Sequence, residues 1–496
     1  MDDDDDDDIP QAAGPLLVDG SAGEYVARGE RRTKSPIWPL LALLLLVNLT
    51  TSIQNLPLNR LLERRLCRDY YGPDKDVSEE LCKIDEIQQD LAWTIGCLET
   101  LWVLGDFAMT IPLGFLAEKY GRRAILWLNL VSRLFLLSWA LIVGYLSLPP
   151  QALIAGSALS VLGGDTVFNS LVYVLAAKVT DDNVTRATYF SWMTALSSVI
   201  NFLGPAVAAA TMSLRLFLPF WLGIGLLILA IPTISLLPRV ASTMLVADDE
   251  NQRPLISSPT LKAQASNSTL LSPIVERVRT LVSVVRSHPR NLTLLLISFF
   301  LTSLASSDTK LLAQYISKRY QWTFASAGYL LSLKAVVNFV LLSIAVPFLL
   351  KARRSNTQSQ SQSLSDRGNL RYSSLCLTVS VLGAIAISIS GRVWMLFPSL
   401  LLYALGSPLP VFTLGLLKSP AVSPQDEGNP AGSTDPDAHI FSIVMMSKSL
   451  GSVLGAPLMA TLWFYGIRTA IFGLPFFAST LVYLAAIAVF SGIKLG

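Results

Sequence analysis

The chain has 496 residues, of which 52% are hydrophobic and only 15% carry a charge. Soluble globular proteins carry about 25% charged residues, so this composition excludes an ordinary soluble enzyme. The 38 basic and 35 acidic residues give a formal net charge of +3, which is too balanced for a nucleic-acid-binding protein.

Residues 1–35 are predicted to be a disordered, acidic, cytoplasmic tail. An uninterrupted acidic run extends from Asp2 to Asp8, and such a run repels itself and cannot bury a core. Acid rather than a basic segment precedes the first apolar stretch, and no small-residue cleavage site follows it cleanly. We therefore do not expect a cleaved signal peptide, and the first apolar stretch is expected to remain as a membrane anchor.

Long apolar stretches then recur along the chain, each near the ~20 residues that a helix needs to cross a bilayer. They are too long for the strands of a membrane barrel, which are about 10 residues of alternating polarity. The sequence therefore predicts an all-α membrane protein with twelve transmembrane helices. The expected spans are 36–57, 90–117, 122–146, 150–178, 186–212, 216–238, 290–316, 325–350, 372–391, 393–418, 438–463 and 468–492.

One long polar stretch divides these spans into two sets of six. It covers residues 239–289 and separates a bundle at 36–238 from a bundle at 290–496. Equal sets of helices around a linker are typical of the two pseudo-symmetric halves of a transporter. Lysine and arginine gather between alternate spans, so the positive-inside rule places the linker and both termini in the cytoplasm.

Two of the four cysteines, Cys67 and Cys82, fall in the outer loop predicted for residues 60–89. An oxidising exterior would join them in a disulfide bond, and two free thiols are the alternative. Cys97 and Cys376 lie within spans and are expected to be inert packing residues.

The turn between the second and third spans has the sequence GFLAEKYGRR, from Gly114 to Arg123. A glycine such as Gly121 suits a tight turn, and a small residue such as Gly114 lets two helices approach closely. Glu118 is placed to pair with Arg122 or to cap a facing helix. An ordinary positive-inside turn would explain the arginines, but not two glycines and an acid at this spacing.

This segment resembles the loop motif of the major facilitator superfamily, Gly-x-Leu-Ala-Asp-Arg-x-Gly-Arg-Arg, with Glu118 in place of the aspartate and Lys119 in place of the arginine. With the spans and the linker, the resemblance covers nearly the whole chain. It implies the major facilitator fold and a transporter driven by protons or another gradient. It also implies an inner gate, to which it assigns Gly114, Glu118, Gly121 and Arg122, with Arg123 beside them.

Antiporter motifs of this family are present only in part. The fifth span contains Gly204-Pro205, but alanines follow where paired glycines are expected, and Ser160 rather than an arginine precedes the glycines of the fourth span. The chain is most similar to fungal-type drug and metabolite transporters. A weaker similarity, through the long outer loop with cysteines, is to proton-coupled folate-type carriers.

Ionisable residues inside the spans are functional candidates, because burying an unpaired charge costs several kcal/mol. Asp106, Arg133 and Asp165 fall on successive spans, about 16–20 Å from the inner loops and so near the midplane. Arg133 either forms a structural pair with Asp106 or is shared by both aspartates, which leaves one acid unmatched. An unmatched carboxylate suits proton exchange, and Asp165 is the preferred candidate.

Other polar residues are assigned to a hydrated path for a solute. Asn169 lies one helical turn after Asp165, and Asn55 belongs to a polar face of the first span. Three roles are open for Lys448 in the eleventh span: binding an anionic solute, neutralising Asp165 in one state, or extending to the inner surface. In the second half, Asp308 and Lys334 are expected to form a structural pair near the outer surface.

These features predict a secondary active transporter of a small organic solute that works by alternating access, preferably by proton-coupled export of drugs or secondary metabolites. Proton-coupled uptake and a non-transporting nutrient receptor on the same fold are the alternatives. The absence of G-x-x-x-x-G-K-[ST] and H-E-x-x-H motifs argues against an ATP-driven pump and a membrane enzyme. We expect a monomer in the lipid bilayer of the plasma membrane, with the solute and protons as partners and no cofactor, metal or nucleic acid.

Overall fold

The computed structural model describes residues 37–72, 78–160, 162, 164–177, 179, 183–237, 290–345, 348, 362–417 and 436–493. The predicted tail (1–35) and linker (239–289) lie outside these residues. The elements of the first half are α1 (Trp38–Tyr71), η1 (Glu79–Lys83), α2 (Asp85–Tyr120), α3 (Arg122–Tyr145), α4 (Gln151–Ser160), α5 (Asp165–Ala177), α6 (Asn183–Leu214) and α7 (Leu218–Leu236).

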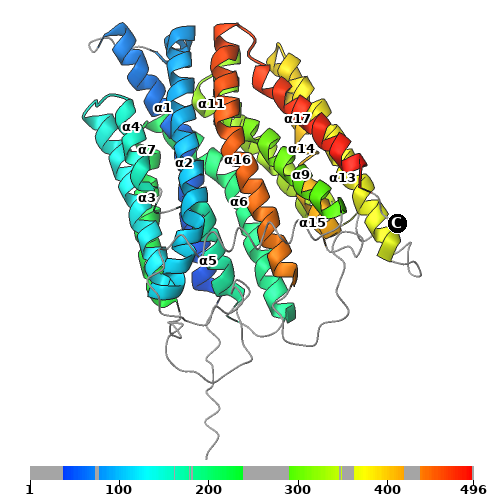
Figure 1. Ribbon diagram of the computed structural model, residues 1–496. Helices are drawn as coiled ribbons and strands as arrows, with labels where there is room; N and C mark the ends of the chain where they lie inside the picture. The colour runs from blue at the N-terminus through cyan, green and yellow to red at the C-terminus, as the bar shows by residue number, and fades with distance from the viewer. Residues whose placement is uncertain are drawn as a thin grey trace, which may run out of the picture. The chain divides into compact units, whose positions relative to one another are not determined.

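The second half is also helical where it is described (Figure 1). Its elements are α9 (Arg290–Ala305), η3 (Ser306–Leu311), α10 (Leu312–Tyr320), α11 (Phe324–Val340), η4 (Leu341–Ala345), α13 (Gln362–Ile389), α14 (Val393–Ala404), α15 (Leu409–Leu417), α16 (Pro436–Arg468) and α17 (Leu474–Ser491).

Within the described residues, 11 helical segments are long and apolar enough to cross a membrane. The remaining predicted span, 150–178, is divided into α4 and α5, each too short to cross alone. Because these two helices occupy the place of one span, the predicted count of twelve agrees with the structure. The predicted fold is confirmed: the protein is an all-α, multi-pass membrane protein.

Buried apolar side chains form one large cluster in each half. The first cluster is built from residues 37–237, together with Ala313 and Phe324 of the second half. The second is built from residues 292–493, together with Ala92 of the first half. Each six-helix bundle therefore has its own core, and the three exceptions mark places where the halves touch.

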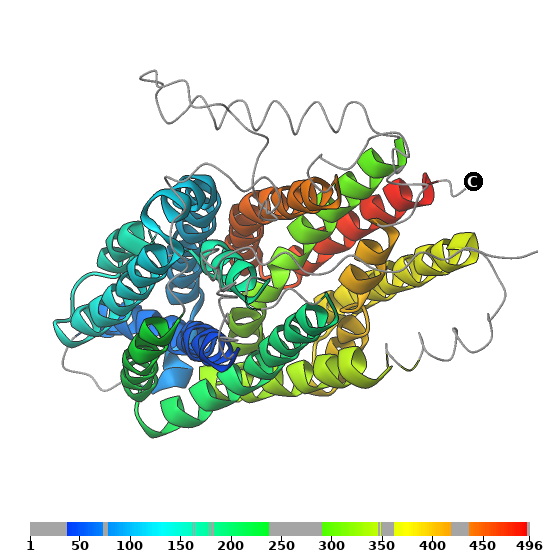
Figure 2. The same ribbon diagram turned by 90° about the horizontal axis from the view of Figure 1, so that it is seen from below.

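Two helix pairs make the main contacts between the halves: α2 packs along α16, and α6 packs along α11 (Figure 2). The α2–α16 contact is tight at Gly96, where an added Cβ would lie 2.6 Å from the Cβ of Ala460. The ring centroids of Trp93 and Phe464 lie 6.3 Å apart nearby. Because residue numbers rise along one helix as they fall along the other, the two helices are antiparallel.

The first helix is longer than predicted. The expected span ends at residue 57, but α1 continues to Tyr71. Leucines at helical spacing carry it onward, and Leu61, Leu62 and Cys67 are buried within it. The predicted outer loop is thus largely the end of α1, the short helix η1 and the start of α2.

A disulfide bond joins Cys67 on α1 to Cys82 on η1. We call this end of the bundle the disulfide end. The opposite end, where α2 and α3 meet at Gly121, is called the Gly121 end.

Candidate functional site

A polar cluster lies inside the first half, where α1, α3 and α5 meet. Arg133 is buried, pairs with Asp165, and donates a hydrogen bond to Thr51 Oγ1. Its Nε donates to Asn129 Oδ1 at 2.8 Å, and its guanidinium lies 5.5 Å from the ring centroid of Phe168. The structure therefore brings Arg133 to Asp165, not into the alternative pair with Asp106.

Asp106 on α2 joins this cluster through the start of α5. Its carboxylate accepts from the Thr166 hydroxyl at 2.6 Å and from the Thr166 backbone N–H at 3.1 Å. The free N–H groups in the first turn of a helix favour a negative charge there. Among the described residues, no cation lies within ion-pair distance of Asp106, so it is the aspartate without a counter-ion. An added Cβ at Gly164 would overlap its carboxylate.

The predicted polar wall on α5 reaches the first helix. Asn48 Nδ2 donates to Asn169 Oδ1 at 3.1 Å, one turn beyond Asp165. Asn55 is exposed and is not brought to this cluster. Asn59, one turn further along α1, instead accepts from Gln314 of the second half at 3.0 Å.

Lys448 lies on α16 in the second half and is partly buried. Its backbone carbonyl accepts from Ser303 Oγ at 2.6 Å. Its ammonium group has no hydrogen-bond or ion-pair partner in the part of the chain that the structure describes. Asp165, one of its predicted partners, is already paired with Arg133.

A second buried acid, Asp308, lies within the core of the second half. It accepts from Tyr403 OH at 2.9 Å, and the hydroxyls of Tyr403 and Tyr483 lie 3.2 Å apart. The Lys334 ammonium lies 5.1 Å from the Tyr403 ring centroid, and in the described structure it makes no ion pair with Asp308. The expected surface pair of Asp308 and Lys334 is therefore wrong, because Asp308 is fully buried and its carboxylate accepts from the Tyr403 hydroxyl.

At the Gly121 end, the loop motif has one clear conformational requirement. Gly121 has φ of 93°, which glycine adopts without steric cost. Arg123 Nε donates to the Ile234 carbonyl at 2.8 Å, and its Nη2 donates to the Ser235 carbonyl. Arg123 thereby donates to two carbonyl groups in the last turn of α7.

The remaining residues of the loop motif do not all lie as predicted. Arg122 begins α3 and is partly buried. The side chain of Glu118 lies outside the described residues. An added Cβ at Gly114 would meet no atom within 4 Å, so the close helix approach expected there is not present in this structure.

At the disulfide end, a buried lysine joins the two halves. Lys83 is only 2% exposed. Its ammonium donates to Glu63 Oε1 at 2.6 Å and to Ser317 Oγ of α10 at 2.6 Å. It also lies 4.4 Å from the ring centroid of Phe324 on α11. No partner for this lysine was predicted, although basic and acidic residues are balanced across the predicted loop.

Further polar contacts join the halves at the same end. The Glu79 carboxylate accepts from the Phe324 N–H at 2.8 Å, which caps the first turn of α11. Three more contacts are Lys318 to Asp85 at 2.6 Å, Lys310 to Glu99 at 2.6 Å, and Gln314 to Asn59 at 3.0 Å. The structure is thus closed at the disulfide end.

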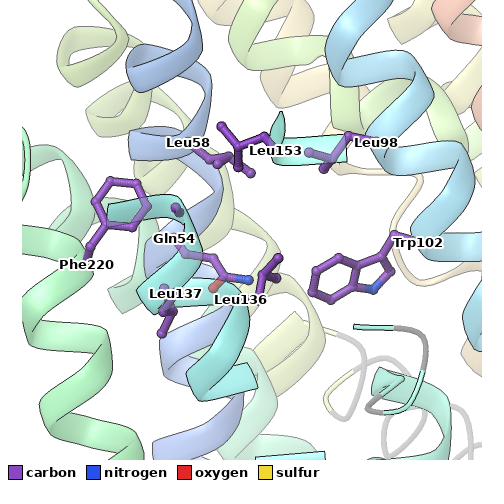
Figure 3. Close-up of a pocket in the computed structure, with 9 residues that line it drawn as sticks. Gln54, Leu58, Leu98, Trp102, Leu136, Leu137, Leu153 and Phe220 are labelled. Carbon is purple, nitrogen blue, oxygen red and sulfur yellow. The ribbon is translucent and has the colours of Figure 1, made fainter. Parts of the chain in front are cut away.

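A small pocket within the first half is separate from these clusters (Figure 3). Its walls are apolar apart from Gln54, and none of the predicted site residues lines it. The lining residues are Gln54, Leu58, Leu98, Trp102, Leu136, Leu137, Ala140, Leu153 and Phe220.

Comparisons with known proteins agree with this architecture. The family model described as Major Facilitator Superfamily matches residues 84–427, which is more than half of the chain. The chain is 26% identical to the MFS efflux pump atnC of Emericella nidulans over 450 residues, covering 88% of this chain and 83% of the relative. It is 26% identical to the MFS-type transporter aprT of Aspergillus flavus over 414 residues, covering 80% and 75%.

A solved structure shows the same fold. The crystal structure of the nucleoside transporter NupG superimposes with a TM-score of 0.59 at 12% sequence identity, covering 92% of this chain and 98% of that one. At this identity the similarity concerns the fold alone. The family match and the helical architecture together confirm the resemblance seen in the loop motif, and the chain belongs to the major facilitator superfamily of membrane transporters.

Proposed function

We propose that the protein exports a small organic solute, of the drug or secondary-metabolite type, in exchange for protons. The two halves expose a path between them first to one side of the membrane and then to the other. The observation that carries the proposal is the intramembrane cluster of Arg133, Asp165 and Asp106. The relative from Emericella nidulans that is named an efflux pump supports export as the direction.

The charges of the cluster favour the binding of one proton. The cluster contains two carboxylates and one guanidinium, which pairs with Asp165, so it has an excess negative charge unless one acid is protonated. The Asp165 side chain is 37% exposed, which allows it to exchange a proton with water in the path. Binding of that proton weakens the pair with Arg133 and frees the guanidinium.

The disulfide end is assigned to the exterior, because disulfide bonds persist in oxidising compartments. This orientation agrees with the positive-inside rule and places both termini in the cytoplasm of a plasma-membrane protein. The inner gate is then the loop motif at the Gly121 end. Its proposed members are Gly114, Glu118, Gly121, Arg122 and Arg123.

Export can be tested without knowing the solute. Cells that produce the protein are compared with cells that produce Asp165→Asn, and small organic solutes inside the cells and in the medium are measured by mass spectrometry. We expect cells that produce the parent protein to move one or more solutes into the medium. A protonophore is expected to abolish this movement. In Asp165→Asn, the transport that remains is expected to be insensitive to the protonophore.

Asp69→Asn is the matched control, because Asp69 is 47% exposed and pairs only with Arg65 at 3.2 Å in the described structure. It should behave like the parent. Accumulation of a solute inside the cells would instead support uptake, and unchanged solutes on both sides would support a receptor that does not transport.

A further inference from the structure

Two membrane-embedded side chains of opposite charge, one in each half, have no charged partner in the part of the chain that the structure describes. Asp106 on α2 accepts only from Thr166. Within the described ranges, the ammonium group of Lys448 on α16 has no hydrogen-bond or ion-pair partner. Because an unpaired charge in the membrane costs several kcal/mol, each is expected to meet a counter-charge at some stage of the transport cycle.

The two residues lie at nearly the same level. The antiparallel helices α2 and α16 meet where Gly96 contacts Ala460. Asp106 follows Gly96 by ten residues, and Lys448 precedes Ala460 by twelve. At about 1.5 Å per residue, both lie about 15–18 Å from that contact, toward the Gly121 end.

The face of α2 that carries Asp106 also carries a residue that contacts the second half. Glu99 precedes Asp106 by seven residues, or about two helical turns, so both lie on one face. Glu99 pairs with Lys310 on η3 at 2.6 Å. Asp106 therefore lies about two turns from this contact on the same face of α2, where its carboxylate binds Thr166 at the start of α5.

The Lys448 face of α16 is turned toward the span formed by α9 and η3. Ser452 lies one turn from Lys448 and its Oγ lies 2.9 Å from Ser303 Oγ on α9. Met445, almost one turn before Lys448, is 38% exposed, so this face is not fully covered by packing. Asp106 and Lys448 thus lie on the same side of the contact between α2 and α16.

The charges around Asp106 leave it available for a new partner. The charged residues that face it from the helices packed on α2 are Asp165 on α5 and Arg133 on α3, and these two neutralise each other. Around Lys448, the neighbours on α9 are uncharged. The hypothesis that Lys448 neutralises Asp165 is less favourable, because Asp165 already has a cation.

We infer that Asp106 and Lys448 form an ion pair between the two halves in the state that is open at the disulfide end and closed at the Gly121 end. This inference rests on the proposed alternating access. Opening the disulfide end breaks the contacts that Lys83, Lys310 and Lys318 make between the halves. Closing the Gly121 end brings together the parts of α2 and α16 that lie between Gly96 and that end. The new ion pair then offsets part of the free energy lost with the contacts at the disulfide end.

The test uses a cysteine that reports on opening of the disulfide end. Ala313 lies on α10 but is 7% exposed within the core cluster of the first half, so it is covered by contact between the halves. Ala313→Cys is made in the full-length chain with Cys97→Ala and Cys376→Ala. The rate at which a membrane-impermeant maleimide labels Cys at this position then measures how often the disulfide end opens, with no solute required.

Asp106→Asn keeps an acceptor for Thr166 but removes the charge, and Lys448→Gln removes the other charge. Each single change removes the ion pair that would offset part of the cost of opening, so we expect labelling about tenfold slower, equivalent to about 1.4 kcal/mol. The double variant has no further interaction to lose, so its labelling rate should equal that of the single variants and not the product of their two effects. Purely additive effects, or single variants that label at the parental rate, would overturn the inference.

Lys334→Gln is the matched control, because Lys334 also lacks an ion pair in the described structure but contacts Tyr403 inside the second half. Its effect should simply add to that of Asp106→Asn, whereas the effects of Asp106→Asn and Lys448→Gln should not add. The Ala313→Cys reporter with Asp106 and Lys448 intact separates the proposal of alternating access from the proposal of the ion pair. If it is never labelled, the disulfide end does not open, and alternating access and the ion pair both fail; if it is labelled but shows no coupling, only the ion pair fails.

Discussion

At the scale of single residues, Glu63 shows how strongly a buried charge depends on its partners. It is 0% exposed. Its carboxylate accepts from Arg60 at 2.9 Å, from Lys83 at 2.6 Å and from Gln88 at 2.6 Å. A buried charge that loses its partner costs far more free energy than an exposed one.

Glu63→Gln should therefore lower the stability of the closed disulfide end. The amide keeps the shape of the side chain, but it leaves Lys83 with only a 3.4 Å contact to Glu79 as its acidic partner in the described structure. We expect a loss of about 3–5 kcal/mol, measured as a lower Tm of the purified protein in detergent. Asp69→Asn removes an exposed ion pair and should cost about 1 kcal/mol or less. Equal effects of the two substitutions would contradict the assignment.

The two glycines of the loop motif should respond differently to alanine. Gly121 has φ of 93°, and alanine in this conformation costs about 1–3 kcal/mol. Gly114 lies in the interior of α2 beside open space, so Gly114→Ala should be neutral or stabilising by up to about 1 kcal/mol. Thermal unfolding of the two variants measures the difference. If Gly114→Ala is the more destabilising, a packing role that this structure lacks must exist in another state.

At the scale of elements, η1 is the segment that the disulfide bond positions. The bond closes a loop with a sequence separation of 15 between Cys67 and Cys82. It holds η1 against the end of α1, which places Lys83 and Glu79 opposite α10 and α11. The network between the halves therefore depends on a covalent link within one half.

Replacing Cys67 and Cys82 by serine should cost about 3 kcal/mol, because a loop of this length regains that much conformational freedom when unfolded. The same loss of stability should appear as a lower Tm when the parent protein is unfolded by heat in the presence of a reductant. A variant with Cys97→Ala and Cys376→Ala is the control and should show the parental response to the reductant. A Tm that does not change on reduction would contradict the role given to this bond.

Much of the helical fold could be predicted, because apolar stretches of membrane length are a strong local signal. The predicted and observed helices differ where the apolar stretches end. The helix α1 continues past residue 57 on an amphipathic face with buried Leu61 and Leu62, which a search for continuous apolar stretches passes over. The start of α5 lies next to Gly164, where the Asp106 carboxylate of another helix approaches the backbone, and such a contact between helices has no local sequence signal.

The candidate site was predicted as a set of residues but not as a set of pairs. Depth along each helix placed Asp106, Arg133 and Asp165 together, and the structure brings them into one cluster. Which aspartate pairs with Arg133 depends on how the helices are rotated, and spacing along one helix does not determine this. The contact of Lys83 with Ser317 joins residues 234 positions apart, so no local pattern could reveal it.

At the scale of the whole molecule, the described residues form two bundles with separate cores. The bundles meet through apolar contacts along α2 and α16 and through polar contacts at the disulfide end. Apolar cores resist rearrangement because they are closely packed. Polar contacts between the halves, such as those of Lys83 and Lys318, can be exchanged for others at lower cost. In the proposed transport cycle, the two bundles move relative to each other and the contacts at their two ends alternate.

The most direct test measures distances between the halves at both ends in the same samples. Spin labels at Tyr145 and Trp394, both exposed, report on the disulfide end. Labels at Leu236 and Arg371, also exposed, report on the Gly121 end. Between pH 8 and pH 5 in lipid nanodiscs, we predict that one distance lengthens as the other shortens. Distances that change in the same direction, or that stay fixed at both ends, would contradict alternating access by the two halves.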